Sequence, residues 1–468
     1  MLFNSLHFLV FFPIVVILYF LLKPRYRNIF LLIASYYFYM NWKPIYAVLI
    51  MFSTIITWTC GLIMEKSFKQ RDRKFFLLSS LIINFSILFF YKYFNFLNQV
   101  VFDFLSYFGI RWEMVNLDVL LPVGISFYTF QAIGYTIDVY RKDIKHEENF
   151  VNYSLFVSFF PQLVAGPIER SKNLLPQFRE VKLFKMDNLY VGVKIMLWGY
   201  FLKLVLADRL SLYVDAIFNN IENHNGTSVS IASIFFAFQI YGDFFGYSLI
   251  AIGTAKVMGF ELMTNFMRPY FSLNITSFWR RWHISLSTWF KDYLYIPLGG
   301  NRCGKVRNNF NLFITFFISG IWHGANYTFV IWGALHGLYL IVERILKISN
   351  IAKNYGVMIL KVLFTFILVD FAWIFFRSNT INDAFMAILK IFTSNGNVPF
   401  IRADIFIGST IAICILFFKE FKDEYFPDRY NFISNKNPYV SSFFFILLFS
   451  LILLMGVFES GQFIYFQF

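Results

Sequence analysis

Long apolar runs constrain this sequence more than any other feature. Twelve runs are long enough, or nearly long enough, to cross a bilayer: residues 6–22, 29–42, 45–64, 75–96, 119–140, 151–166, 189–207, 229–259, 310–342, 357–376, 405–418 and 441–458. A hydrocarbon core of about 30 Å needs about 20 residues of helix per crossing. We therefore expect an all-α, polytopic integral membrane protein with about 10–12 transmembrane helices, together with re-entrant or amphipathic helices.

The composition excludes two other classes of protein. Of the 468 residues, 58% are hydrophobic and 15% are charged, against about 45–50% and about 25% in soluble domains. A water-soluble enzyme cannot bury that much apolar surface, and a disordered chain has the opposite composition. No repeat of fixed period and no Ser/Gly-rich linker divides the sequence, so residues 1–468 are expected to form a single membrane-embedded domain.

The excess of basic residues is interpreted as a topology signal. Lys and Arg number 41 against 27 acidic residues, a net charge of +14. We expect no nucleic-acid partner, because basic residues collect in the cytoplasmic loops of membrane proteins. The basic loops at 23–27 and 65–74 are separated by two predicted spans and so lie on one side. This arrangement predicts an extracytoplasmic amino terminus, and it favours a cytoplasmic side for the basic stretch 170–185 as well.

Metal and nucleotide chemistry have no support in the sequence. Cys60, Cys303 and Cys414 are far apart and form no CxxC pair, so no metal site is expected. The GxxxxGK[ST], HExxH and GxSxG motifs are absent, which leaves an ATP-driven pump, a metalloprotease and an α/β-hydrolase without support.

His323 is the strongest candidate for chemistry. It lies in SGIWHGAN (319–326), thirteen residues into the run 310–342, or roughly 20 Å at the helical rise. That run is too long for one crossing, and we expect two segments that meet near residues 320–326. An ionisable residue at mid-membrane depth indicates a function, and imidazole is suited to act as a base. Gly320 and Gly324 would allow a break or a close backbone approach; the alternative is a His that only hydrogen-bonds packed helices.

The segment 276–295 contains His283 in a Trp-rich, basic setting. It is interpreted as one helix, capped by Thr276 or Ser277, with its aromatic residues on one face. Two interpretations remain open. The segment is an interfacial amphipathic helix, or it lines a cytoplasm-facing mouth whose basic side chains attract a phosphate-bearing donor. The basic side chains in question are Arg280, Arg281 and Lys291.

The other polar residues in or beside apolar runs carry weaker signals. His336 lies thirteen residues after His323, on nearly the opposite face unless the helix breaks, and is assigned a structural role. His146 is expected to be a solvated surface residue. Asp243 needs a partner such as a Tyr hydroxyl or a basic side chain, and Lys203 is expected to snorkel to the interface.

The motifs together identify a family. WRRWHISLS (279–287) with DYLYIPLGGN (292–301), and SGIWHGA (319–325) with WGALHG (332–337), resemble the membrane-bound O-acyltransferases, and most of all the alginate O-acetyltransferase branch. Supporting likenesses are LPVGISFYTF (121–130), AGPIER (165–170), DFFGYS (243–248) and FIYFQF (463–468), so the resemblance covers essentially the whole chain. Phe245 departs from the Ser expected in the DFSGYS-like segment, which affects a packing detail.

This resemblance implies a ring of helices around a central tunnel, where a cytoplasmic donor and an extracytoplasmic acceptor meet at one buried His. His323 matches the near-invariant family His, and His283 matches a second motif position that is Asn or Asp in many relatives. These two are the expected catalytic residues. The expected substrate-binding residues are Trp322, Arg280, Arg281 and Lys291. No permanently bound cofactor and no metal are expected; acetyl-CoA is the expected acyl donor.

The expected function is transfer of an acetyl group from acetyl-CoA, across the cell membrane, towards hydroxyls of an exported polysaccharide. His323 would serve as general base or as transient acyl acceptor, and an extracytoplasmic esterase-like partner would complete delivery. One alternative is transfer of a D-alanyl or other acyl group from a carrier protein to teichoic acid or peptidoglycan. A polysaccharide or lipid transporter without chemistry, and a structural scaffold, are the remaining alternatives.

Overall fold

A computed structural model of the chain describes all residues except 165, 353, 398–402, 428–436 and 459–468. Every regular element among the described residues is helical, with no strand, which confirms the all-α prediction. The FIYFQF segment (463–468) and the first residue of AGPIER lie outside the described residues.

The chain divides into two compact units. The first comprises Met1–Leu189 with Thr254–Met263, and the second comprises Tyr190–Gly253 with Thr264–Phe468. The chain crosses between the units within α10 (Met186–Tyr200), within α12 (Gly226–Val257) and after Met263. The expectation of a single domain over residues 1–468 stays a prediction.

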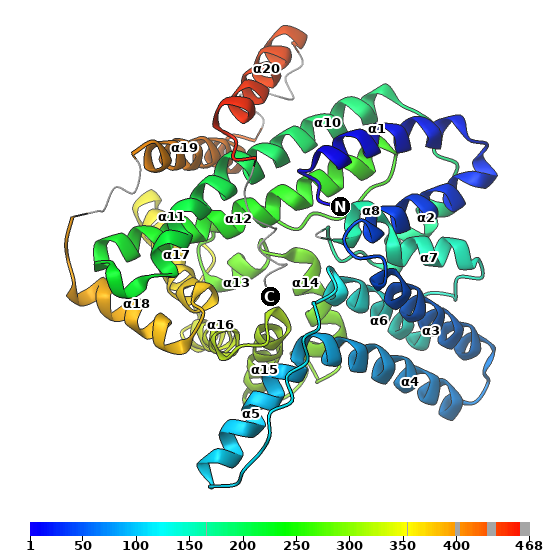
Figure 1. Cartoon of the computed structure of the whole chain (residues 1–468), viewed down its shortest axis with the longest axis horizontal. Helices are drawn as coiled ribbons and strands as arrows, with labels where there is room; N and C mark the ends of the chain where they lie inside the picture. The colour runs from blue at the N-terminus through cyan, green and yellow to red at the C-terminus, as the bar shows by residue number, and fades with distance from the viewer. Residues whose placement is uncertain (165, 353, 398–402, 428–436, 459–468) are drawn as a thin grey trace. The chain divides into compact units, whose positions relative to one another are not determined.

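The first unit contains α1 (Leu6–Leu21), α2 (Pro24–Met40), α3 (Tyr46–Lys66), α4 (Gln70–Leu88), a π-helical turn (Phe89–Tyr93), α5 (Phe94–Tyr107), α6 (Ile125–Arg141), α7 (Phe150–Ser158), α8 (Phe160–Leu163) and α9 (Ser171–Arg179). Helices α3, α4 and α6 pack side by side (Figure 1). Arg73 is buried where they meet and donates to Met64 O at 2.5 Å and to Val139 O at 3.0 Å. A cation at the ends of two helices is favoured by their dipoles, so Arg73 ties α3 to α6.

His146 corrects the expectation of a solvated surface residue. It lies in the loop before α7, yet only 5% of it is exposed. The Tyr135 hydroxyl lies 2.8 Å from His146 Nδ1, and the Trp58 ring lies 5.4 Å from the imidazole. The polar sequence around His146 indicates a loop correctly, but the aromatic side chains of α3 and α6 cover that loop.

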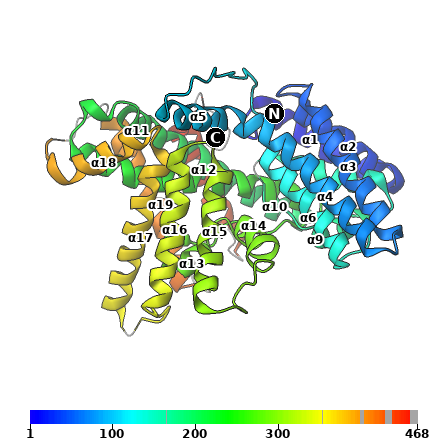
Figure 2. The ribbon, with the colours of Figure 1, turned by 90° about the horizontal axis from the view of Figure 1, so that it is seen from below.

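The second unit contains α10 (Met186–Tyr200), a π-helical segment (Phe201–Ala207), α11 (Asp208–Phe218), α12 (Gly226–Val257), α13 (Ile275–Trp279), α14 (Ile284–Phe290), a second π-helical turn (Lys291–Tyr295), α15 (Lys305–His323), α16 (Tyr327–Ile345), α17 (Tyr355–Arg377), α18 (Ile381–Thr393), α19 (Ala403–Tyr425) and α20 (Pro438–Met455), besides short 3₁₀ turns. Figure 2 shows α15, α16 and α17 side by side. Helix α15 ends at His323, and each of the three helices contributes an aromatic ring beside that residue.

Seven helices among the described residues are long and apolar enough to cross a membrane: Tyr46–Lys66, Gln70–Tyr107, Met186–Phe218, Gly226–Val257, Tyr327–Ile345, Tyr355–Arg377 and Pro438–Met455. The prediction of a polytopic membrane protein is thereby confirmed. The count is lower than the 10–12 spans expected, because several runs form shorter helices, such as α1 with 16 residues and α6 with 17.

Lys203 does not snorkel to the interface, contrary to the sequence expectation. It is 1% exposed, and its ammonium lies 2.6 Å from Asp208 Oδ1 and 2.7 Å from Asp243 Oδ1. A buried charge needs a partner within reach, and the π-helical segment Phe201–Ala207 places Lys203 between two. The sequence predicted a Tyr hydroxyl or a basic side chain as the partner of Asp243, and the structure shows the basic side chain of Lys203.

Candidate active site

The α15–α16 hairpin confirms that the run 310–342 is two segments. Helix α15 ends at His323 and α16 begins at Tyr327, where the Asn326 side chain accepts from Thr328 N at 3.1 Å. Gly320 on α15 faces Gly333 on α16. A Cβ at Gly320 would lie 2.4 Å from Phe329 O and 3.0 Å from Gly333 Cα. The glycine at 320 therefore serves a close approach of two helix backbones.

His323 lies in an aromatic enclosure at the end of α15. Its residue exposure is 3%. The imidazole centroid is 5.0 Å from that of Trp322, 4.9 Å from that of Trp332 and 5.4 Å from that of Phe376. Helices α15, α16 and α17 each contribute one of these rings. The surroundings of the imidazole thus depend on the packing of three helices.

His336 approaches the same enclosure because the helix breaks. Its ring lies 4.9 Å from Trp332, which also contacts His323. Trp279 Nε1 donates to His336 Nδ1 at 3.3 Å, and His336 is fully buried. The sequence allowed the two histidines to share a site only if the helix broke, and it does. The contacts of His336 are those of a packing residue that holds Trp279.

The segment 276–295 is not one helix, which corrects the sequence expectation. Helix α13 ends at Trp279 and α14 begins at Ile284. Between them the chain turns, and His283 adopts a left-handed φ of 42°. The helix cap is Asn274, whose side chain accepts from Ser277 N at 2.8 Å, and neither Thr276 nor Ser277. Periodicity over the segment could not reveal this break, because all its residues are compatible with helix.

Two buried polar side chains hold this turn in place. Asn265 O accepts from Ile284 N at 2.9 Å, and Asn265 Oδ1 accepts from Ser285 Oγ at 2.6 Å. Glu343, near the end of α16, accepts from Ile275 N at 2.7 Å. A carboxylate at a helix N-terminus is favoured by the helix dipole. Glu343 therefore fixes the start of α13, which carries Trp279 and leads into Arg280.

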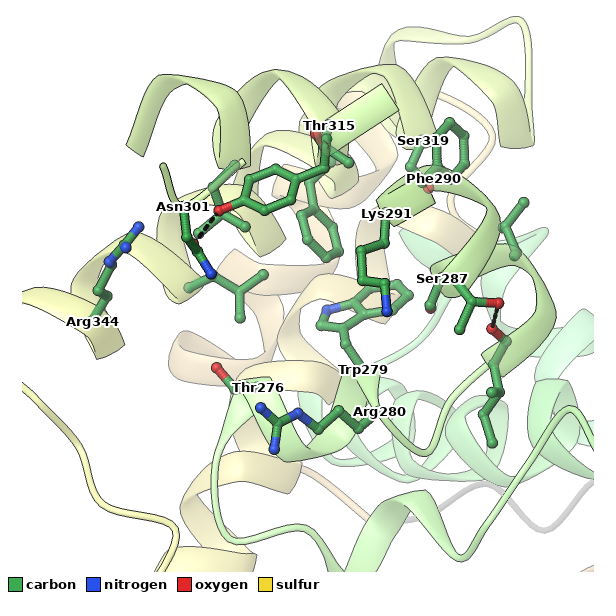
Figure 3. A pocket seen from close by; sticks show the side chains of 17 residues that line it. Thr276, Trp279, Arg280, Ser287, Phe290, Lys291, Asn301, Thr315, Ser319 and Arg344 are labelled. Atoms are coloured by element: carbon green, nitrogen blue, oxygen red, sulfur yellow. Dashed lines mark hydrogen bonds between the residues drawn. The ribbon is translucent and has the colours of Figure 1, made fainter. Parts of the chain in front are cut away.

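A cavity of about 600 Å³ opens beside this turn (Figure 3). Drug-sized and cofactor-sized ligands occupy pockets of roughly 300–1,000 Å³. The cavity has apolar walls that include Trp279, Phe290 and Phe316, with hydroxyl groups from Ser287, Thr315 and Ser319. Ser319 belongs to α15 and precedes His323 by one helical turn. The cavity thus reaches the helix that carries His323, although His323 is not among its lining residues.

Three cations line the cavity: Arg280, Lys291 and Arg344. Figure 3 shows the Lys291 side chain over Trp279, with Arg280 and Arg344 at the edge. The Lys291 ammonium lies 3.9 Å from Asp292 Oδ1. Arg344 contacts Asn309 Oδ1 at 3.5 Å. This edge of the cavity is strongly basic and favours an anionic group.

Arg281 lies apart from the other predicted cations. Its guanidinium pairs with Glu424 of α19 at 2.9 Å, and Glu424 also binds Arg268. Burial acts to raise the pKa of Glu424, but hydrogen bonds from Arg268 and Arg281 outweigh it, and the pKa is lowered. Arg281 is therefore engaged in an ion pair and does not line the cavity.

Trp322 has both His283 and His323 as ring neighbours. The Trp322 indole is 6.3 Å from the His283 ring and 5.0 Å from the His323 ring. His283 is fully buried, and Phe244 packs edge-on against it at 4.6 Å. This burial lowers the pKa of His283 to about 3, so the imidazole is neutral at physiological pH. The structure thus brings His323, His283 and Trp322 together in one buried cluster.

Sequence analysis missed Arg344 and Glu343. They directly follow the apolar run 310–342. An adjacent acid and base at the end of a span was the available signal, because such pairs mark a surface at the headgroup level. The contact of Glu343 with Ile275 N could not be inferred, since the two residues are 68 positions apart in the chain.

The WHISLS-like segment supplies His283 and the WHG-like segment supplies Trp322 and His323, so both motifs contribute to one buried cluster. A family model described as MBOAT, membrane-bound O-acyltransferase family, matches residues 141–375, half of the chain. The chain belongs to the membrane-bound O-acyltransferase family. The match spans the cavity, His283 and His323. This protein is therefore a multi-pass membrane O-acyltransferase.

This membrane-bound O-acyltransferase is similar to three named bacterial enzymes. It is 40% identical to the probable alginate O-acetylase AlgI of Pseudomonas aeruginosa over 82% of this chain and 73% of that protein. It is 35% identical to the peptidoglycan O-acetyltransferase of Helicobacter pylori, over 85% and 80%. It is 27% identical to the teichoic acid D-alanyltransferase of Bacillus subtilis, over 54% and 68%.

The described residues contain no group of three or more His, Cys, Asp or Glu side chains that could hold a metal ion.

Proposed function

We propose that this enzyme transfers an acetyl group from acetyl-CoA to hydroxyls of an exported polysaccharide. The similarity to an alginate O-acetylase and to a peptidoglycan O-acetyltransferase supports a saccharide acceptor and an acetyl group. The single observation that carries the proposal is the position of His323. It lies one helical turn beyond Ser319, where the basic, apolar-walled cavity meets α15.

The cavity is proposed as the donor site. Arg280, Lys291 and Arg344 would hold the phosphates of CoA, because guanidinium and ammonium groups bind phosphate through charge-assisted hydrogen bonds. The apolar walls would accept the pantetheine chain and direct the thioester towards α15. Arg281 would act indirectly, by holding the turn after α13 to Glu424 of α19.

The chemistry follows from what acyl transfer requires. His323 would accept the proton of the acceptor hydroxyl, whose oxygen attacks the thioester carbonyl. The carbon–sulfur bond breaks, the proton passes to the leaving thiolate, and an ester and CoA are the products. Trp322 would contact the acyl group, since its indole borders His323. His283 would support Trp322 from the other side.

The enzyme is proposed to act in the cell membrane, with its amino terminus outside and the donor cavity on the cytoplasmic side. An extracytoplasmic esterase-like partner is proposed to pass the acetyl group on to the polymer. Transient acylation of His323 would suit such a relay, whereas direct general-base catalysis would suit an acceptor that reaches the imidazole itself.

A second candidate is D-alanyl transfer from a carrier protein. It is favoured by the 27% identity to a teichoic acid D-alanyltransferase over about half of this chain. The acetyl donor is preferred, because the O-acetylating relatives share higher identity over more of the chain.

Labelled donors separate these candidates. Membranes that contain the enzyme are incubated with labelled acetyl-CoA or with labelled D-alanyl carrier protein, and the label in the polymer is counted. We expect label from acetyl-CoA only, and a loss of about 10²-fold or more in the His323→Ala variant, as for removal of a general base. His7→Ala, at an exposed histidine, is the matched control. Label from the carrier protein alone would overturn the acetyl assignment.

A further inference from the structure

The first unit contains a cavity that the proposed reaction does not use. Its volume is about 410 Å³. Its walls come from the end of α1, the start of α2, the start of α7, and the end of α9 with the residues after it. We infer that this cavity binds the phosphate-bearing headgroup of an anionic membrane phospholipid. The inference is independent of the proposed function, because its residues and its tests are separate from those of the donor cavity.

The charge of the cavity favours an anion. Four cations line it: Arg25, Arg27, Arg179 and Lys182. Arg179 Nε donates to Glu147 Oε2 at 3.0 Å, and Lys182 pairs with Glu180 at 2.6 Å. Two carboxylates thus meet four cations, which leaves an excess of two positive charges. A phosphodiester or a phosphomonoester would balance that excess.

Hydrogen bonds to backbone carbonyls position the Arg27 guanidinium at the cavity. Its Nε donates to Leu22 O at 3.0 Å, and its NH1 donates to Lys182 O at 2.5 Å. Carbonyl oxygens orient a guanidinium without cancelling its formal charge. Arg25 is exposed, and its guanidinium lies 4.5 Å from the Tyr26 ring. Arg25 is therefore placed to swing onto a ligand, whereas Arg27 is fixed in place.

The start of α2 adds to the positive potential. Helix α2 begins with Pro24, its N-cap Lys23 makes no side-chain cap hydrogen bond, and its first turn has no acidic residue. The partial positive charge of this helix end is therefore open to an anion. Asn28 Nδ2 donates to Phe178 O at 2.6 Å and to Asn152 Oδ1 at 2.8 Å, which fixes α2 against α7 and α9. The side chains of Asn28 and Asn152 thus join three helices at the cavity wall.

The surroundings favour a lipid over a free phosphate. Exposed apolar side chains flank the cavity: Leu21 is 75% exposed, Val181 59% and Phe184 49%. The Phe184 ring packs against Phe20 of α1 at 5.3 Å. A free phosphate would fill little of the cavity and would make no use of these side chains. A glycerophospholipid would place its headgroup in the cavity and its acyl chains along the exposed apolar face of α1.

The position along the chain agrees with this assignment. The basic loop 23–27 and the basic stretch 170–185 are the segments that the positive-inside rule assigns to the cytoplasmic side. Cytoplasmic leaflets carry anionic lipids, and juxtamembrane cations gain roughly 1 kcal/mol each there. A lipid bound here would link α1, α2, α7 and α9, and so would stabilise the first unit.

Thermal unfolding in detergent tests the inference. The purified full-length protein is stripped of lipid, and its melting temperature is measured with phosphatidylglycerol, phosphatidylcholine or inorganic phosphate added. A ligand that binds only the folded protein raises the melting temperature. We expect phosphatidylglycerol to raise it by several degrees, and the other two additives to leave it unchanged. Lipids extracted from the protein before stripping are expected to be enriched in anionic species.

Charge variants identify the site. Arg25→Gln, at an exposed residue, and Arg27→Lys, which keeps the charge, separate a ligand effect from misfolding. We expect Arg25→Gln to lose most of the phosphatidylglycerol shift while keeping the lipid-free melting temperature, and Arg27→Lys to retain part of the shift. Arg71→Gln, an equal charge change at an exposed residue in the first turn of α4, is the control and should keep the shift.

Three outcomes would overturn the inference. An equal shift with phosphatidylcholine would indicate a response to lipid in general. The same shift with inorganic phosphate would indicate a site for free anions. An equal loss in Arg71→Gln and Arg25→Gln would indicate a response to overall charge. Each outcome leaves the proposed acetyl transfer untouched, because none of these variants contacts the donor cavity.

Discussion

At the scale of single residues, Trp279 connects the two halves of the candidate site. Its ring lines the donor cavity, and its indole N–H donates to His336 Nδ1. It also packs at 5.7 Å against Trp332, which borders His323. Trp279 is thus the wall between the cavity and the buried imidazoles. A wall of that size is expected to limit the acyl group that the site accepts.

Trp279→Ala is predicted to relax acyl-chain selectivity. One added methylene in an apolar pocket changes discrimination by about 10-fold or more, so the ratio of kcat/KM for propionyl-CoA to that for acetyl-CoA should rise by about 10-fold. Trp279→Phe is the matched control, since it removes the N–H donor but keeps most of the wall. An unchanged ratio in Trp279→Ala, with the protein folded, would show that another residue sets the limit.

His283 is predicted to contribute nothing to the pH dependence of activity near neutrality. Its pKa is lowered to about 3 by burial, so protonation occurs only at pH values well below those of an activity assay. The neutral form is present from about pH 5 upwards. His283→Asn should therefore lower the rate but leave the acidic limb of the kcat/KM profile in place. A shift of that limb by half a unit or more would contradict the assignment of a neutral His283.

At the scale of elements, the close crossing of α15 and α16 sets the position of His323. A Cβ at Gly333 would lie 2.5 Å from Phe316 O and 2.9 Å from Gly320 Cα. Real side-chain carbons do not tolerate such distances to backbone atoms, so both positions require glycine. Any added group would push the helices apart and move His323 away from Trp332.

Gly320→Ala is predicted to destabilise the protein by about 2 kcal/mol, within the range of overpacked cores, and to lower activity further by displacing His323. The melting temperature and the acetylation rate are the measurements. Gly356→Ala, at a helical glycine whose Cβ would meet only Asn354 Oδ1 at 3.5 Å, is the control and should be neutral or slightly stabilising. Equal melting temperatures for the two variants would show that the helices can separate without cost.

At the scale of the whole molecule, the sequence predicted features that depend on local composition. The all-α polytopic fold and the break in the run 310–342 follow from apolar length and from the polar and small residues near 320–326. The family followed from two motifs. The turn at Arg280–His283 was missed, because it depends on hydrogen bonds that Asn265 accepts from Ile284 and Ser285. It also depends on the carboxylate of Glu343, which accepts from the start of α13. The burial of Lys203 and His146 was missed, because their partners lie on other helices.

In the candidate site, too, some features were predicted from the sequence and others depend on the tertiary fold. The proposed roles of His323, His283 and Trp322 came from motif and depth, and the structure brings the three together. Arg280 and Lys291 were grouped by their sequence proximity, and they do line one cavity. Arg281 is adjacent to Arg280 in sequence yet pairs with Glu424, because the chain turns between α13 and α14. The local sequence shows which residues are charged, but the tertiary fold determines which partner each charged side chain contacts.

The central claim is that one cavity delivers the donor to His323. The most direct measurement is steady-state release of CoA from acetyl-CoA, with acceptor present, by equal amounts of folded wild-type protein and His323→Gln. The account predicts that kcat falls by about 10²-fold or more, as for loss of a general base, while KM for acetyl-CoA changes less than about twofold. Undiminished CoA release by His323→Gln would contradict the account.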